Sequence, residues 1–274
     1  MSGVELTLRH HFEGTLDASP ILPERLLTLN QADIERTPLE VGGRNLVIGD
    51  LFSIAVLQST TLVIQGPVMN SYRWGREMSR GHLVVECDVG DEAGLTMRGG
   101  MLELRGSVGD RLGCGMQAGR IQVIGNAGNF VGCPEMGKRR GMRGGLIAID
   151  GNAGDRLGDC MRRGTILVHG NVGDYAAARM IAGTIAICGN LGKQAGVMMR
   201  RGTVWAPRLE TANLSGIFSA AQRVQLPHLT LWYRWLATID SRLSEWRTHE
   251  NDAQRWLGDL SVQGLGEFIS PAPR

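Results

Sequence analysis

The sequence lacks the features that mark membrane proteins and secreted, disulfide-stabilised proteins. Its 274 residues contain no apolar run of membrane-spanning length. Residues 1–12 show no basic segment followed by an apolar one, so no signal peptide is expected. Cysteine is scarce: the five residues are an odd number and form no C-x-x-C motif, as is typical of a reducing compartment. These absences predict a cytoplasmic protein with no membrane partner.

Signatures of common enzymes and metal sites are missing as well. The chain has no H-E-x-x-H, no G-x-S-x-G and no Walker loop. Aromatic residues make up 5% and the formal net charge is +2, which disfavours nucleic acid as a partner. Lysine is limited to Lys138 and Lys193, so 27 of the 29 cationic residues are arginine, the side chain that binds carboxylate or phosphate bidentately. The sequence predicts no catalytic residue and no metal site.

Glycine, in contrast, is abundant and periodic. One series recurs every 19 residues, except for a single interval of 26. A repeat of this length predicts a solenoid, and glycine suits its sharp corners because it adopts positive φ without a Cβ penalty. The corner glycines are Gly81, Gly100, Gly119, Gly145, Gly164, Gly183 and Gly202.

Between these glycines, apolar and polar residues alternate as in short half-buried strands. A coil of 19 residues is too short for a strand and a crossover helix, so the strands are predicted to stack in parallel as one β-helix. A methionine three positions before each corner glycine is predicted to fill that corner. Two inward columns are expected, the first formed by Leu83, Leu102, Ile121, Ile147, Ile166, Ile185 and Val204, the second by Val85, Leu104, Val123, Ile149, Val168 and Ile187.

The predicted fold class is therefore all-β dominated: a single parallel β-helix solenoid with an N-terminal cap and a C-terminal α-helical segment. Residues 1–61 form the cap and lead-in, with an edge strand at 4–8 and a short helix at 23–29. Residues 62–207 form the β-helix. Residues 208–274 form the helical extension, in which an apolar spacing from Trp232 to Trp246 predicts one amphipathic helix. This helix is expected to lie on the rod or on a partner.

Three features of the rod invite a chemical interpretation. Cys114, Cys133 and the nearby Cys160 suggest a three-thiol metal site, but small buried hydrophobes are favoured. Asp150 and His169 neighbour each other on an outward column as an acid and base pair would, yet a structural ion pair is favoured. The adjoining outward column becomes apolar toward its C-terminal end, so the C-terminal helix or another subunit is expected to cover it.

Arginines line one edge of the rod, just before the corner glycines. The coil that ends at Gly145 gains seven residues, and this bulge (133–144) is also basic. For any single arginine, acidic residues in nearby turns, such as Asp91 and Asp159, are favoured over a ligand as the balancing charge. For the whole row, a polyanionic ligand or an acidic partner is favoured. The candidate polyanion-binding residues are Arg98, Lys138, Arg139, Arg140, Arg143, Arg162, Arg163, Arg200 and Arg201.

The repeated corners V-G-D-R-L-G (108–113) and A-G-D-R-L-G (153–158), with the lead-in L-x-I-G-D-L-F (46–52), resemble a known β-helix family. The resemblance covers about residues 40–207. The family includes the C subunit of formylmethanofuran dehydrogenase and the C-terminal domain of the glutamate synthase large subunit. The lead-in and the chain length are similar to those of the dehydrogenase C subunit. The arginine bias favours the bacterial branch, the C subunit of the formyltransferase/hydrolase complex.

The resemblance implies a role in one-carbon (formaldehyde) oxidation. In that branch a formyl group passes from tetrahydromethanopterin to a methanofuran or methylofuran coenzyme and is hydrolysed to formate. The C subunit is implied to be non-catalytic beside a formyltransferase subunit, an amidohydrolase-like subunit that holds the metal, and a further subunit. Because such coenzymes carry glutamate-derived tails, the arginine edge is a candidate tether. The alternatives are the C subunit of a molybdenum or tungsten formylmethanofuran dehydrogenase, or a purely structural scaffold whose arginines dock an acidic subunit.

Overall fold

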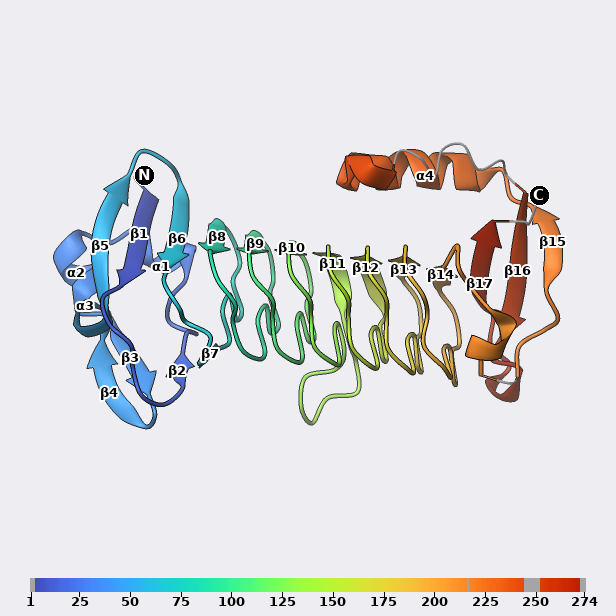
Figure 1. Cartoon of the computed structure of the whole chain (residues 1–274), viewed down its shortest axis with the longest axis horizontal. Coiled ribbons are helices and arrows are strands. Elements are labelled where there is room, and N and C mark those ends of the chain that lie inside the picture. The colour runs from blue at the N-terminus through green and yellow to red at the C-terminus, as the bar shows by residue number, and fades with distance from the viewer. Residues whose placement is uncertain (1–2, 216, 244–251, 272–274) are drawn as a thin grey trace.

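The computed structural model describes residues 3–215, 217–243 and 252–271. Strands dominate and helices are few: thirteen strands form one large, mostly parallel sheet, and four short strands form a second sheet. Figure 1 shows an elongated molecule in which strands β6 to β14 follow one another along the long axis. In the part of the chain described, no helix combines the length and the apolar character needed to cross a bilayer.

The central strands are stacked in register. Each pairs in parallel with the strand of the following coil, so that Leu83 lies beside Leu102 and Leu102 beside Ile121. A second column of parallel bridges, which includes Val89↔Val108 and Val108↔Ala127, repeats along the other side of the coils. The stacked strands are β6 (Thr61–Gln65), β8 (His82–Val85), β9 (Met101–Leu104), β10 (Arg120–Val123), β11 (Arg143–Ile149), β12 (Arg163–Val168), β13 (Thr184–Ile187) and β14 (Thr203–Trp205).

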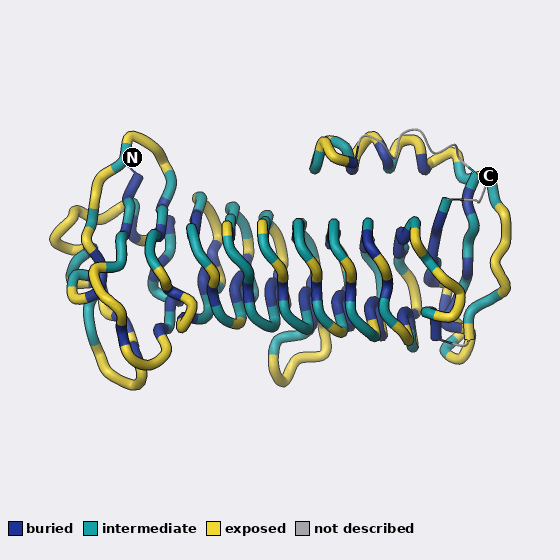
Figure 2. The backbone as a smooth tube through the Cα atoms, in the orientation of Figure 1, coloured by how far each residue is buried: buried dark blue, intermediate teal, exposed yellow. Residues whose placement is uncertain are grey.

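Both predicted inward columns form the core of this stack. Every residue of the two columns is 0% exposed, and Figure 2 shows buried residues recurring from coil to coil along the stack. The methionine column is equally buried and belongs to the same apolar cluster, which confirms its predicted packing role. The methionines are Met78, Met97, Met116, Met142, Met161, Met180 and Met199.

Gly145 shows why the corner position requires glycine. Its φ is +88°, and a Cβ there would lie 2.7 Å from Met116 Cε and 2.8 Å from the carbonyl oxygen of Gly119. Left-handed backbone and close approach of the preceding coil therefore both exclude a larger side chain. Because the methionine of one coil fills the space below the glycine of the next, the two periodic residue types form one packing unit.

Polar side chains at two turn positions connect successive coils. The Oδ1 atom of Asn126 accepts a hydrogen bond from the backbone N–H of Asn152, and Asn152 does the same for Asn171, both at 2.8 Å. A parallel ladder uses Asp110 and Asp155, which accept from Asn129 and Asp174 in the next coil. The asparagines after the strands do not take up positive φ; their side chains instead satisfy backbone N–H groups that a turn would leave unpaired.

The N-terminal segment covers the first coil with an antiparallel strand pair, β1 and β5, and a small sheet. Strand β1 (Gly3–Leu8) is not the expected edge strand: it pairs in parallel with β6 and antiparallel with β5 (Phe52–Leu57), so β5 forms the edge. The short helix α1 (Pro23–Leu26) falls within its predicted range. The remaining elements are β2 (Leu16–Asp17), α2 (Gln31–Glu35), β3 (Pro38–Val41), β4 (Arg44–Val47), α3 (Ile48–Leu51) and β7 (Ser71–Tyr72).

The C-terminal segment is less helical than predicted. Helix α4 spans His228–Ile239 and ends before Asp240, whose backbone is extended; Trp246 lies outside the described residues. Strand β17 (Gly266–Pro271) instead extends the large sheet beyond β14, followed by β16 (Asp252–Gly258) and β15 (Gln222–Gln225). Trp256 is buried and belongs to the main apolar cluster. Short 3-10 turns occur at Thr211–Asn213 and Leu260–Val262.

Helix α4 covers the apolar outward column. It runs along the outside of the C-terminal coils in Figure 1. Leu167, Ala186 and Trp205 of the stack form one buried cluster that includes Tyr233 and Leu236 of the helix. The rings of Trp205 and Tyr233 meet edge to face, with centroids 5.2 Å apart. The expectation that this strip is covered is confirmed, and the cover comes from the same chain.

Candidate anion-binding site

The bulge (133–144) forms a loop that projects from the stack between β10 and β11, on the side away from α4 (Figure 1). Backbone hydrogen bonds close its base: Met142 N donates to Gly132 O at 2.8 Å, and Gly141 N donates to Cys160 O at 3.0 Å. Arg143 N then donates to Met116 O at 2.7 Å, which returns the chain to the stack. The seven extra residues therefore leave and re-enter the coil without disturbing the core register.

The loop and the coil surface together enclose a pocket of about 390 Å³. Four of the predicted cationic residues line it, along with a single carboxylate, Glu135. Four cations around one acid give a local excess of positive charge that attracts anions. We call this site the basic pocket; it is lined by Thr96, Gly115, Glu135, Lys138, Arg139, Arg140 and Arg143.

Arg162 and Arg163 lie on the coil next to the basic pocket. Arg163 is the register partner of Arg143 across strands β11 and β12, and Arg162 N donates to Met142 O at 2.8 Å. The Nε atom of Arg162 is buried without a hydrogen-bond partner. A buried donor of this kind costs free energy unless a ligand or water accepts from it. Two of the predicted arginines therefore adjoin the pocket without lining it.

The other three predicted residues are separate from the pocket. Arg98 stacks on the same edge, but Gln117 interrupts the row between Arg98 and Arg143. Ile181 interrupts it again before Arg200 and Arg201. Arg98 is also paired with Glu77 at 3.2 Å. The predicted row is thus divided into a central group around the pocket, one paired arginine, and an arginine pair at the C-terminal end.

Among the described residues, no acid forms an ion pair with the central group. Within residues 3–215, 217–243 and 252–271, the ion pairs include Arg98 but none of the other eight predicted residues. Asp91 and Asp174 accept backbone N–H groups of the next coil, and Asp159 is paired with Arg179. The acids predicted as an internal offset therefore have other partners.

The sequence pattern did not indicate Thr96, Gly115 or Glu135 as lining residues. Glu135 could have been predicted as a lining residue, because it lies within the insertion beside the basic residues. Thr96 and Gly115 come from the two coils before it, and the bulge reaches back over them. That placement follows from the direction in which the loop folds, which the repeat does not encode.

The structure brings two cysteines together near this loop. Cys114 Sγ and Cys133 Sγ are 3.0 Å apart and buried. The hydrogen bond with Cys133, together with burial, raises the pKa of Cys114. Cys160 does not join them in a three-residue metal-ligand cluster among the described residues. The pair packs with Leu95 and Phe130, as small apolar residues do.

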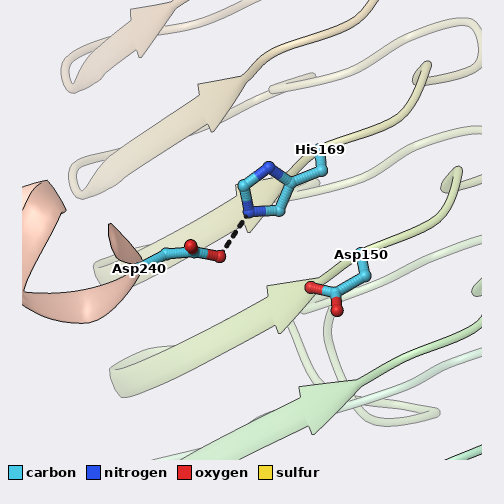
Figure 3. A group of neighbouring side chains, drawn as sticks. All are labelled: Asp150, His169 and Asp240. Atoms are coloured by element: carbon cyan, nitrogen blue, oxygen red, sulfur yellow. Dashed lines mark hydrogen bonds and ion pairs between the residues drawn. The ribbon is translucent and has the colours of Figure 1, made fainter. Parts of the chain in front are cut away.

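Asp150 and His169 belong to a charge cluster under the end of α4 (Figure 3). His169 Nε2 lies 2.7 Å from Asp240 Oδ2, and Arg242 Nη2 lies 2.6 Å from Asp150 Oδ1. Arg242 also pairs with Asp240 and lowers the pKa of that carboxyl well below its usual range. We call these four residues the charge cluster. It joins the C-terminal segment to the stack, and nothing in the sequence spacing indicated its two C-terminal members.

The geometry of the charge cluster favours a structural role over a catalytic or metal-binding one. Ligand atoms of Asp150, His169 and Asp240 lie within 4.8 Å of one another, close enough to suggest a metal, but the guanidinium of Arg242 already pairs with both carboxylates. Cys188 Sγ is 3.6 Å from His169 Nδ1, yet burial raises its pKa to about 12. At neutral pH the thiol is therefore protonated and a poor nucleophile.

Comparison with known proteins identifies the family. No protein-family model matches the chain. The C subunit of the formyltransferase/hydrolase complex Fhc from Methylorubrum extorquens is 36% identical over 85 residues, which cover 31% of this chain and about a third (32%) of that relative. The fold is similar to a chain in the crystal structure of the formyltransferase/hydrolase complex FhcABCD from the same organism, in complex with methylofuran. That match has a TM-score of 0.88 and 34% identity, and it covers 98% of this chain and 100% of the other. The chain therefore belongs to the family of the C subunit of the formyltransferase/hydrolase complex.

Proposed function

We propose that this chain is a non-catalytic subunit that holds the anionic tail of a furan coenzyme at the basic pocket. The observation that carries the proposal is a pocket lined by Lys138, Arg139, Arg140 and Arg143. None of these four side chains forms an ion pair among the described residues. The structurally similar complex binds methylofuran. A tail of glutamate carboxylates is the ligand class that guanidinium groups hold best.

The architecture fits a scaffold. We propose that residues 62–207 form a parallel β-helix, supported by the two columns of parallel pairing that repeat from coil to coil. Residues 1–61 act as its cap, and the described part of residues 208–274 adds helix α4 and strands β15, β16 and β17 at the other end. Such a rod presents binding residues at fixed intervals of about 4.8 Å. Its partners are then a formyltransferase subunit, an amidohydrolase-like subunit and a further subunit.

Within this proposal, chemistry takes place on the partner subunits. Formyl transfer from tetrahydromethanopterin and metal-dependent hydrolysis to formate both need groups that the basic pocket does not offer. Each contact between a cationic side chain and a carboxylate is modest, so the tail can move from one contact to the next. Several contacts together are strong enough to retain the tail. The pocket therefore keeps the coenzyme near two active sites without reacting with it.

Titration with a tetra-γ-glutamate peptide tests the tether. The full chain should bind the peptide, and the affinity should fall as salt rises. Charge reversal by Arg139→Glu, Arg140→Glu and Arg162→Glu should weaken binding at least about tenfold. The matched control reverses Arg36, Arg44 and Arg234, which are exposed and lie outside the pocket. Equal affinity of the wild type and the pocket variant would overturn the proposal.

Two further measurements test the assignment to a complex. Tagged chain co-expressed with the other three subunits of its own host should copurify with the amidohydrolase-like and formyltransferase subunits. The isolated chain should release no formate from formylated coenzyme. Steady turnover by the isolated chain would show that it is an enzyme in its own right. Failure of the chain to copurify with any of the three subunits would exclude the scaffold role.

A further inference from the structure

Four large apolar side chains are exposed on neighbouring segments at the C-terminal end of the stack. In a water-soluble chain such residues are usually scattered singly, and a group of them marks an interaction surface. Each of the four is between 45% and 68% exposed. We call them the corner patch; they are Met198, Ile217, Leu260 and Leu265.

Backbone hydrogen bonds hold the segments of the corner patch next to one another. Leu260 N donates to Ile217 O at 2.9 Å, which joins two of its segments. Met198 N donates to Asp259 Oδ2 at 2.9 Å, next to Leu260. Leu265 N donates to Arg200 O at 2.6 Å, which joins the end of the stack to the turn before β17. The four residues therefore come from three separate segments that meet at this corner.

The surface under the patch is firmly packed. Phe218, adjacent to Ile217, stacks edge to face on Phe268 with centroids 5.2 Å apart. Asp259 is 1% exposed and accepts hydrogen bonds from the backbone N–H groups of Met198 and Ser261. A frayed chain end would not hold an inward carboxylate in this way. The exposure of the patch is thus a feature of a rigid surface that is ready to bind without ordering cost.

Two cations stand beside the patch. Arg200 and Arg201 are exposed, and within the described ranges neither forms an ion pair. An apolar centre with an unbalanced basic rim fits a surface that is apolar at its centre and acidic at its rim. A second copy of this chain fits poorly, because a two-fold contact would bring the arginine pairs of both copies together.

We propose that the corner patch, with Arg200 and Arg201, docks an acidic-rimmed apolar surface of another subunit of the complex. This inference assigns the arginine pair to a protein partner and the central group around the basic pocket to the ligand. It rests on the proposed membership of a complex but not on tail binding. Arg200 lies three coils from Arg143, about 14 Å along the stack, so the docked subunit sits beside the proposed tail site.

Substitutions at the patch test the proposal in the assembled complex. The chain is co-expressed with the other three subunits of its host, and assembly is measured by native mass spectrometry. Leu265→Glu combined with Ile217→Glu should release one specific subunit or weaken its retention at least tenfold. Both side chains are exposed, so the fold tolerates the change. Leu231→Glu is the matched control, since Leu231 is 67% exposed on the outer face of α4.

Charge and contact are then tested separately. Arg200→Glu with Arg201→Glu should weaken retention of the same subunit, whereas tetra-γ-glutamate binding by the chain should stay within twofold. A photo-crosslinker at position 265 should label that subunit next to Asp or Glu residues. Wild-type assembly of the Leu265→Glu, Ile217→Glu variant would overturn the proposal. A crosslink to a second copy of this chain, with a dimer that the variant loses, would also overturn it.

Discussion

His169 Nε2 and Asp240 Oδ2 lie 2.7 Å apart although 71 positions separate the two residues in sequence. The contact joins a strand end of the stack to the residue at which α4 ends. Arg242 bridges from the same turn to Asp150 on the neighbouring coil, and Arg120 Nη2 donates to Ile239 O at 3.3 Å. These polar contacts fix the end of the helix, while apolar packing fixes its body.

Removal of the Asp240 carboxylate should loosen this anchor in a pH-dependent way. Arg242, and to a lesser extent His169, lower the pKa of Asp240 in the folded chain. Its contribution is therefore fully present above the unfolded value of about 4 and declines as the pH falls toward the lower folded value. We expect Asp240→Asn to cost about 2 kcal/mol at pH 7, with a smaller difference from the wild type at pH 3.

Urea unfolding at both pH values measures that difference. Glu77→Gln is the control, because its pair with Arg98 is exposed on both sides and such pairs contribute less than about 1 kcal/mol. A difference between Asp240→Asn and the wild type that does not change with pH would show that the carboxylate acts through packing alone.

Gly145→Ala should destabilise the chain by more than backbone strain alone. A left-handed alanine costs about 1–2 kcal/mol, and at Gly145 the new Cβ would also meet Met116 Cε and the Gly119 carbonyl. Gly43→Ala isolates the first effect, since Gly43 has a φ of +77° and no atom within 4 Å of the added Cβ. We expect thermal unfolding to show the larger loss for Gly145→Ala; equal losses would mean that the coil moves to accommodate the methyl group.

Truncation under α4 should leave a cavity between the helix and the sheet. Leu167 is 0% exposed in the cluster that joins the two. Leu167→Ala is expected to lower the free energy of unfolding by about 2–4 kcal/mol, whereas Leu231→Ala on the exposed face of the helix should change it little. Chemical denaturation measures both. A neutral result at Leu167 would show that the helix settles onto the smaller side chain.

Glu135 should limit the affinity of the basic pocket for anions. Glu135 lines the same 390 Å³ space as the four cations, so its negative charge repels an incoming carboxylate. We expect Glu135→Gln to strengthen tetra-γ-glutamate binding about five- to tenfold at low salt, with the gain shrinking at high salt. Calorimetric titration checks this, with Glu77→Gln as the control. Weaker binding would mean that Glu135 positions the arginines.

The repeat made the stack predictable, because a fixed period places every residue in a column. The first column, from Leu83 to Val204, is buried throughout, and Met116 lies where the corner spacing predicts. Strand β1 was harder to place, since its position between β5 and β6 depends on pairing outside the repeat. The same holds for β16 and β17, because the tryptophan spacing before them predicted a helical segment instead of strands.

The site was predictable in composition but not in arrangement. The insertion before Gly145 and its cations indicated where the basic pocket forms. The division of the arginine row follows from Gln117 and Ile181, which were visible in the sequence, but its significance depends on which acids are already engaged. Asp174, for example, is close in sequence to the basic edge, yet its carboxylate bonds the backbone of Lys193 at 2.7 Å.

The side-chain ladders give successive coils the same hydrogen bonds to their neighbours. Because Asn152 bonds Asn171 just as Asn126 bonds Asn152, a duplicated or deleted coil of this type would meet the same donors and acceptors on either side. Adding one coil would therefore move the two ends of the chain about 4.8 Å further apart without new packing. The number of coils therefore sets the distance between the N-terminal sheet and the strands that follow β14.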